Sequence, residues 1–313
     1  MSWVTNGHTL EYLSCTKGKD ISTFWRHFSY WLDISLSGRD YLNKVVSQQL
    51  KLNHLLGVLA LDACYFGKLC LITYIDYGTR LPLLYRISTG EYTEEIKSDL
   101  VTLIQNGYPL HTIVSDGKLT INKAIKQLNL SLNTNIKQQL CLAHIQRTCQ
   151  TYLTKRPKTQ AGKDLKTLVS KLCLITDLNL KNNWLRELKQ LQTKHLFFIQ
   201  EKTIKEVIIT QPSGRKVYKI KWWYTHKYLR RAYIHLIRHL DKLFVYLNNP
   251  MVPKTNNLSE GLFSVLKLWI KKHRGLKQTR LSAFIFYLLS YRFYKKQGLK
   301  HNSIGMKIFR LIY

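Results

Sequence analysis

The spacing of hydrophobic and polar positions changes twice along the chain. Between Leu55 and Ser88, apolar runs rich in β-branched and aromatic residues are separated by turn signals, which predicts strands over 55–67, 68–79 and 81–88. Because the connections are very short, we expect these strands to form an antiparallel meander. The first run is apolar almost throughout, so its strand is expected to be covered on both faces.

Helices and strands alternate in the next part of the chain. Residues 93–107 have acids in the first helical turn and Asn-Gly at the end, which predicts a helix. The pattern then predicts a strand at 111–117, a helix at 119–129, and a fifth strand from 136 that runs into a basic helix at 145–153. We therefore expect an α/β fold with a mixed five-stranded sheet flanked by helices.

A mainly helical, cationic and aromatic stretch interrupts this fold. Its aromatic residues can form a core or stack on nucleic acid, and 204–220 reads as a hairpin around Pro212-Ser-Gly-Arg. The predicted organisation is an N-terminal helical segment 1–52, a discontinuous catalytic domain 53–150 and 250–300, a helical insertion domain 151–249, and a tail 301–313. In the first segment, Ile21–Leu32 is either the remnant of a helix-turn-helix or a helix packed on the next domain.

The composition of the chain indicates which kind of partner it binds. The 313 residues are 45% hydrophobic and carry 49 Lys and Arg against 18 Asp and Glu, a formal charge of +31, which favours a polyanionic partner such as nucleic acid. The apolar runs are shorter than the roughly 20 residues of a membrane span, and no secretion signal opens the chain, so we expect an intracellular protein. Six cysteines without a CxxC pair are expected to be reduced core residues.

Three carboxylates stand out against this background. Asp62 interrupts the apolar run of the first strand, Asp116 ends the fourth strand, and Glu260 lies in the first turn of a late helix over 258–270. A buried carboxylate is costly unless a cation compensates it. Plainer readings exist, since Asp62 could cap a turn and Asn257 with Glu260 could form a capping box. Asp76 is interpreted as a turn residue.

Four motifs in order carry a resemblance to a known family. They are Leu-Asp62-Ala, Val-Ser-Asp116-Gly, Cys141-Leu-Ala-His144-Ile-Gln-Arg147 and Thr255-Asn-Asn-Leu-Ser-Glu260-Gly-Leu-Phe-Ser, and together they resemble the DDE transposases of the Mutator-like superfamily and their bacterial insertion-sequence relatives. The resemblance implies a ribonuclease-H-like fold whose first and fourth strands are neighbours. It also implies that Asp62, Asp116 and Glu260 are the catalytic, metal-binding triad.

The resemblance further implies oxygen-ligated Mg²⁺, two ions being expected and Mn²⁺ being able to substitute. Cys141 and His144 are expected beside the catalytic centre, since no second ligand pair supports reading them as half of a zinc site. Side chains expected to contact DNA are Arg147, Lys118, Asn257, Lys267, Arg230 and Arg231.

The implied function is a transposase that cleaves element ends and transfers the 3′-hydroxyl into target DNA. Its partner is double-stranded DNA, on which a homodimer or higher oligomer is expected, with no membrane and a cytoplasmic, nucleoid-associated location in bacteria. The alternatives are a domesticated or truncated DNA-binding derivative and a structure-selective nuclease of the same fold. About 50 residues without paired cysteines precede the catalytic part, so end recognition is expected in the insertion unless the copy is truncated.

Overall fold

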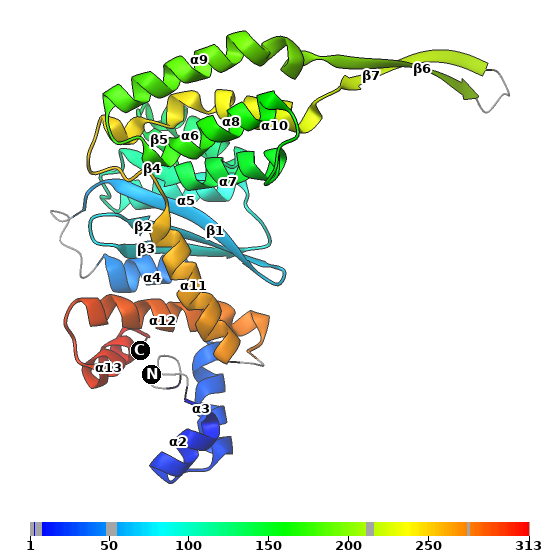
Figure 1. Ribbon diagram of the computed structural model, residues 1–313. Helices are drawn as coiled ribbons and strands as arrows, with labels where there is room; N and C mark the ends of the chain where they lie inside the picture. Colours follow the sequence, from blue (N-terminus) through cyan, green and yellow to red (C-terminus); the bar gives the residue numbers. More distant parts are fainter. Residues whose placement is uncertain (1–2, 4–7, 48–54, 211–215, 274–275, 313) are drawn as a thin grey trace. The chain divides into compact units, whose positions relative to one another are not determined.

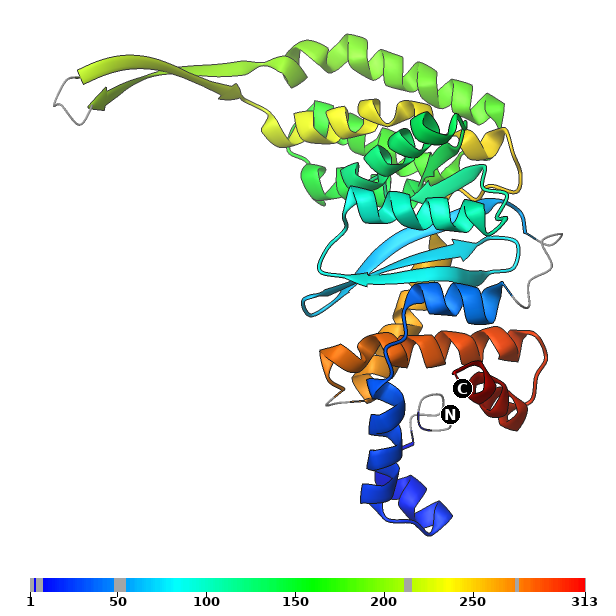
Figure 2. The same ribbon diagram turned by 180° about the vertical axis from the view of Figure 1, so that it is seen from behind.

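The computed structural model (Figures 1 and 2) describes residues 3, 8–47, 55–210, 216–273 and 276–312. It divides into two compact units. The first contains residues 1–138 and 256–313, and the second contains 139–255.

The first unit holds most of the central sheet and its covering helices. Its elements are α2 (Leu10–Lys17), α3 (Ile21–Asp33), α4 (Gly38–Tyr41), the π-helical turn η1 (Leu42–Val46), β1 (Val58–Phe66), β2 (Leu69–Asp76), β3 (Leu81–Ser88), α5 (Thr93–Gln105), β4 (Thr112–Ser115), α6 (Leu119–Leu132), α11 (Asn257–Lys272), η6 (Gln278–Arg280), α12 (Leu281–Lys296) and α13 (His301–Ile312). The strand β5 (Lys137–Leu140) spans the division between the units.

The sheet has the order β3-β2-β1-β4-β5. β1 and β2, and β2 and β3, pair antiparallel, which confirms the expected meander. β1 and β4 pair in parallel. A parallel pair needs a long crossover, which α5 supplies. The mixed five-stranded sheet flanked by helices is therefore as predicted.

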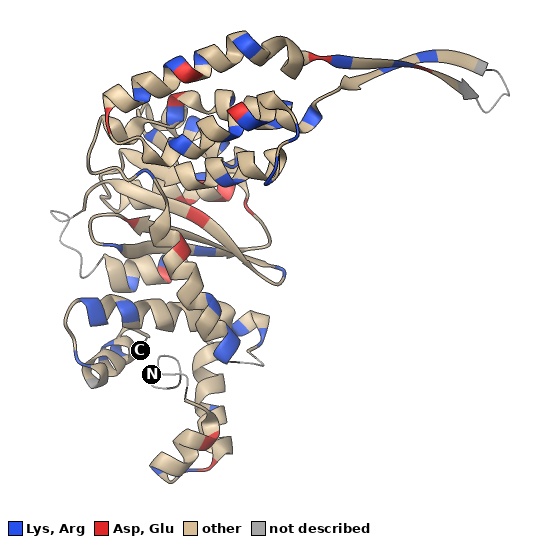
Figure 3. Cartoon of the chain, in the orientation of Figure 1, with Lys and Arg blue, Asp and Glu red and all other residues tan. Residues whose placement is uncertain are grey.

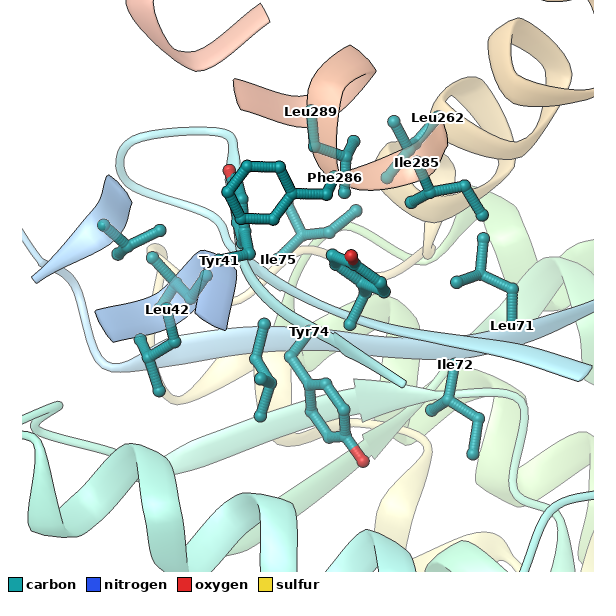
Figure 4. Packing of buried hydrophobic residues seen from close by; sticks show 14 of the residues in the cluster. Tyr41, Leu42, Leu71, Ile72, Tyr74, Ile75, Leu262, Ile285, Phe286 and Leu289 are labelled. Carbon is teal, nitrogen blue, oxygen red and sulfur yellow. The ribbon is translucent and has the colours of Figure 1, made fainter. Parts of the chain in front are cut away.

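Both faces of the sheet are covered, as the apolar run of β1 predicts. In β2, Leu71 and Ile75 point to the side of the sheet on which Ile285 and Phe286 of α12 lie, while Ile72 and Tyr74 point to the opposite face (Figure 4). On that opposite face the Tyr74 hydroxyl donates to Asp99 of α5 over 2.9 Å. The views in Figures 1 and 2 agree with this layering, with α4 and α12 on one side of the strands and α5 and α6 on the other.

The second unit has a hydrophobic core of its own. Its remaining elements are α7 (Leu142–Leu153), α8 (Gln160–Lys171), η3 (Leu172–Leu174), α9 (Leu178–Gln200), β6 (Lys202–Thr210), β7 (Lys216–Tyr224), α10 (Lys227–Arg238), η4 (Leu240–Lys242) and η5 (Val245–Leu247). The inserted segment is mainly helical, and its hairpin pairs Lys202 with Tyr224 through Thr210 with Lys216. The predicted turn at Pro212 lies outside the described residues.

The boundaries of the insertion differ from those expected from composition. The units divide at 138/139 and 255/256, rather than at 150/151 and 249/250. The reason is that the buried side chains of α7, including Ile145 and Cys149, pack in the same cluster as Leu165 and Leu236 of the second unit. Periodicity predicts that α7 has an apolar face, but it does not say which core that face joins.

The first helices also belong to the first unit. In α3, Leu32 is buried and Phe28 packs against the main core, but Ile21 and Trp25 of the same helix remain exposed. Arg280, at the start of α12, donates to Asp33 over 2.6 Å. These contacts favour the packed helix over the helix-turn-helix remnant. Among the described helices, none is both long enough and apolar enough to cross a membrane.

Candidate active site

The strand register brings Asp62 and Asp116 to the same level of the sheet. Ala60 of β1 lies opposite Val114 in the parallel strand β4. Each aspartate lies two residues beyond its member of this pair, and positions two apart in a strand face the same side. Asp116 follows directly after the last residue of β4. The two carboxylates that the sequence singled out therefore meet on neighbouring strands.

Asp62 is held in an environment that disfavours its charge. The residue is 7% exposed, and its Oδ1 accepts a hydrogen bond from the Ala63 amide over 2.9 Å. Burial is the main cause that raises the pKa of Asp62 to about 7, and the charges of Asp116 and Glu91 act in the same direction. A buried acid that retains this cost in a folded protein is a candidate functional group.

Lys118 and Glu91 complete the charged group around the two aspartates. The Lys118 Nζ lies 2.5 Å from Oε1 of Glu91 and 3.6 Å from Oδ2 of Asp116. The Glu91 side chain is only 6% exposed, and its Oε2 is buried without a hydrogen-bond partner among the described residues. The Lys118 amide also donates to Oδ1 of Asp116, which fixes the turn after β4. One lysine thus offsets part of the negative charge of three acids.

Asn256 anchors α11 on the strand that carries Asp62. Its Nδ2 donates to the Leu61 carbonyl over 3.3 Å, and its Oδ1 accepts from the Tyr77 hydroxyl over 3.3 Å. Glu260 lies four residues further along, and residues four apart share one side of a helix. The helix that carries Glu260 is therefore fixed beside Asp62, with Glu260 half-buried on the side of its anchor.

The capping-box interpretation of Glu260 is wrong. The N-cap of α11 is Asn256, not Asn257, and its side chain makes no capping hydrogen bond. A capping box would need the acid three residues after the cap, where this helix has Ser259. The Asn256 side chain is turned away from the helix, since its Oδ1 accepts from Tyr77 and its Nδ2 donates to the Leu61 carbonyl of β1. By contrast, the turn interpretation of Asp76 is confirmed, since its Oδ2 accepts from the Thr79 amide over 2.7 Å.

A cation-lined cavity lies on another side of α11. It has a volume of about 680 Å³, and four of its lining side chains are basic, namely Arg80, Arg292, Lys295 and Lys296. Asn257, a predicted DNA contact, also lines it, and no Asp or Glu is among its lining residues. Partial burial, followed by the charges of Arg80 and Arg292, lowers the pKa of Lys296. Such a group of like charges favours an anionic ligand.

The other predicted site residues are carried by further elements. Lys267 is exposed on α11. Five residues belong to the second unit, where Cys141 is the buried residue before α7, His144 and Arg147 lie in its first turns, and Arg230 and Arg231 lie on α10. The Arg230 guanidinium lies 3.8 Å from the centre of the Tyr224 ring.

The side chains around Asp62 can be compared with the ligands that the implied Mg²⁺ would need, and their donor atoms fit a hard divalent cation. The available donors are carboxylate oxygens, the buried Oε2 of Glu91 has no hydrogen-bond partner in the described part of the chain, and the charge of Asp62 is poorly compensated. In the described part of the chain, no three His, Cys, Asp or Glu side chains are already arranged as a metal site. The donor atoms therefore suit Mg²⁺, while the ammonium group of Lys118 offsets part of the negative charge.

Two residues of this site escaped the sequence reasoning. Glu91 follows β3 and a Thr-Gly pair, so the sequence presents it as one of several acids near the start of a helix. For Asn256, the sequence gives no sign that it, and not its neighbour Asn257, anchors the helix. For Glu91, the available signal was an acid shortly after a strand, which is weaker than the signal of Asp116 because Thr89 and Gly90 intervene.

Two acids lie at the same level on adjacent strands of a mixed sheet, and the chain has a formal charge of +31. This combination is typical of enzymes that process nucleic acid. Comparison with known proteins gives the family. A family model described as "Transposase IS66 family" matches residues 90–268, more than half of the chain, and the chain therefore belongs to this family of insertion-sequence transposases. No curated protein matches the chain.

The family match refines the resemblance seen in the sequence. It supports a DDE insertion-sequence transposase, but not specifically the Mutator-like superfamily. The matched residues include Asp116 and Glu260 and begin after Asp62, so the placement of Asp62 rests on the strand register.

Proposed function

We propose that this transposase cleaves the ends of its element by Mg²⁺-dependent hydrolysis and joins the exposed 3′-hydroxyl to target DNA. The observation that carries the proposal is the shared level of Asp62 and Asp116 on β1 and β4, beside a helix that Asn256 ties to β1. The strand order β3-β2-β1-β4-β5 also supports our proposal that the fold is ribonuclease-H-like.

In this proposal Asp62, Asp116 and Glu260 supply oxygen ligands. When bound, two Mg²⁺ ions, or Mn²⁺ in their place, would activate the attacking hydroxyl and stabilise the leaving oxygen. The chain's own part is to hold these carboxylates on rigid strands and on an anchored helix. Lys118 places an ammonium group beside the acids, where it can contact a phosphate oxygen of the bound strand.

DNA is proposed to reach this centre along the basic cavity of α11. Arg80, Arg292, Lys295 and Lys296 can contact the phosphate backbone, and Asn257 at the cavity edge offers an amide. Arg147, Lys267, Arg230 and Arg231 remain proposed DNA contacts.

Glu260→Gln tests the proposed chemistry. With the capping box excluded, Gln preserves the size of the side chain and removes only the charge. We expect the rate of strand cleavage to fall by about 100-fold or more, since a lost ligand charge raises the barrier by several kcal/mol. The assay uses a labelled duplex with an element end, target plasmid and Mg²⁺, and scores nicking and joining separately.

Glu94→Gln is the matched control, because Glu94 is an exposed acid in the first turn of α5. It should leave both activities unchanged. Nicking without joining in the unmutated protein would favour the nuclease, and absence of both would favour the inactive derivative. Full activity in Glu260→Gln would overturn the proposed triad.

A further inference from the structure

Glu91 is an acid of the site that supplies no ligand in the proposed chemistry. It lies in the segment between β3 and α5, and its partner Lys118 lies at the start of α6. The two side chains differ in burial, since that of Glu91 is 6% exposed and that of Lys118 is 45% exposed. The carboxylate is therefore kept away from water while its ammonium partner is not, and such burial of a charge is costly for the fold.

The Glu91 carboxylate is incompletely satisfied, which argues against a purely structural role. Its Oε1 accepts from Lys118 over 2.5 Å, whereas its buried Oε2 has no hydrogen-bond partner among the described residues. In the buried ion pair of Asp99, by contrast, both oxygens accept from Arg86. A buried ion pair is by itself weak evidence for stability, and an unsatisfied oxygen weakens it further. The pair is better explained by its effect on the position of the ammonium group.

Glu91 determines where the Lys118 ammonium group lies. The Nζ atom is 2.5 Å from Oε1 of Glu91 but 3.6 Å from Oδ2 of Asp116. Hydrogen bonds between charged groups are about 2.7–2.9 Å long, so the second distance is too long for one. The Lys118 amide donates to Oδ1 of Asp116, which keeps both residues in one turn and the ammonium group within reach of this carboxylate. The attraction of Glu91 is what holds the ammonium group off Asp116.

We propose that Glu91 is a positioning residue that holds the Lys118 ammonium group away from Asp116, so that the carboxylate oxygens there stay available to a divalent cation. Burial favours Glu91 in this competition, since the Asp116 side chain is 13% exposed and attraction between charges is stronger where water is excluded. The ammonium group still lies close enough to the site to contact a phosphate oxygen. The inference rests on the proposed metal site and adds a residue that controls its charge.

Glu91→Gln removes the charge that holds the ammonium group. The amide keeps the size of the side chain and an oxygen that can accept from Lys118, but this hydrogen bond is weaker because the acceptor is neutral. The ammonium group should then form a direct ion pair with Asp116. In that position it competes with a metal ion for the same oxygens and repels it.

Binding of Mn²⁺ to the full chain, measured by isothermal titration calorimetry without DNA at one fixed pH, tests this inference. We expect Glu91→Gln to weaken Mn²⁺ binding at least about 10-fold. The decisive variant combines Glu91→Gln with Lys118→Met, because it leaves no ammonium group to pair with Asp116 while keeping the length of the side chain. This double variant should bind Mn²⁺ at least as tightly as the unmutated protein.

Glu94→Gln, the same substitution at an exposed position of α5, is the matched control and should leave Mn²⁺ binding unchanged. Circular dichroism checks the fold of each variant, and an unfolded Glu91→Gln protein would show a structural role and overturn the inference. Unchanged Mn²⁺ binding in Glu91→Gln would also overturn it and leave the proposed function intact. Weak binding that persists in the double variant would show that Glu91 does not act through Lys118.

Asp62→Asn separates this result from a failure of the proposed function. It should weaken Mn²⁺ binding in the otherwise unmutated protein, because it removes a proposed ligand charge. If Asp62→Asn binds Mn²⁺ as the unmutated protein does, the proposed metal site is wrong, and the role of Glu91 is refuted with it.

Discussion

At the scale of single residues, Asp62 is where the needs of folding and of chemistry conflict most clearly. Its charge is buried in the middle of an apolar strand, is opposed by Asp116 and Glu91, and is compensated only in part by Lys118. A fold selected for stability alone would not retain this residue in ionised form. The cost is understandable if the site exists to concentrate negative charge for a cation.

Asp62→Asn should therefore separate stability from activity. Asn keeps an oxygen that can accept from the Ala63 amide and removes the costly charge. At pH 8, above the raised pKa of about 7, we expect the free energy of unfolding to increase by about 1–3 kcal/mol. Strand cleavage should fall by about 100-fold or more. Urea unfolding and the cleavage assay measure the two effects.

Asp241→Asn serves as the control, since Asp241 is exposed in η4, and it should change neither quantity. If Asp62 were only a turn residue, Asp62→Asn would keep its activity. That result would remove Asp62 from the proposed site, whatever its effect on stability.

The residues of the site differ in how far sequence alone could locate them. Asp62 and Asp116 are visible because each interrupts or ends an apolar run. Glu91 is not, because its burial depends on α5, β1 and Lys118 meeting in three dimensions. Similarly, the sequence of α11 permits either Asn256 or Asn257 as the cap, and only the hydrogen bond to Leu61 decides which asparagine is the anchor.

At the scale of elements, a buried ion pair connects α5 to the meander. Asp99 of α5 is 1% exposed and accepts from Arg86 of β3 over 2.6 and 2.5 Å and from Tyr74 of β2 over 2.9 Å. The side chain thus joins three elements, and the Asp99 carboxylate raises the pKa of Arg86. Removing Asp99 leaves the half-buried charge of Arg86 without compensation.

Asp99→Ala should consequently destabilise the first unit by about 3–5 kcal/mol, measured by chemical unfolding of the full chain. Tyr74→Phe is the graded control, since it removes one hydrogen bond and retains the ion pair, and about 1 kcal/mol is expected. Equal effects of the two substitutions would show that the Arg86 contact contributes little to stability.

The elements themselves were largely predictable. Five strands, the helix at 93–107 and the inserted hairpin follow from apolar periodicity and turn residues, which act locally. The limits of the insertion were not predictable to the same extent, because α7 could have packed on either of two cores. The exposure of large apolar side chains on the β6–β7 hairpin also could not be foreseen, since an alternating strand normally predicts one covered face.

At the scale of the whole molecule, the positive charge is distributed over many elements. Lys and Arg occur on the helices of both units and on the β6–β7 hairpin (Figure 3). Because DNA releases condensed counterions when phosphates are neutralised, the number of phosphate contacts can be read from the salt dependence of binding. The slope of log affinity against log salt therefore measures how many of these charges contact DNA at once.

Arg292→Ala should reduce this slope by about 0.9, the value of one phosphate contact, if the cavity beside α11 holds the DNA backbone. The measurement is a fluorescence-anisotropy titration of a labelled duplex at several salt concentrations. Arg310→Ala, at an exposed position near the end of α13, removes the same charge away from the cavity and should leave the slope unchanged. Equal changes in both variants would mean that net charge, and not this cavity, determines how DNA is held.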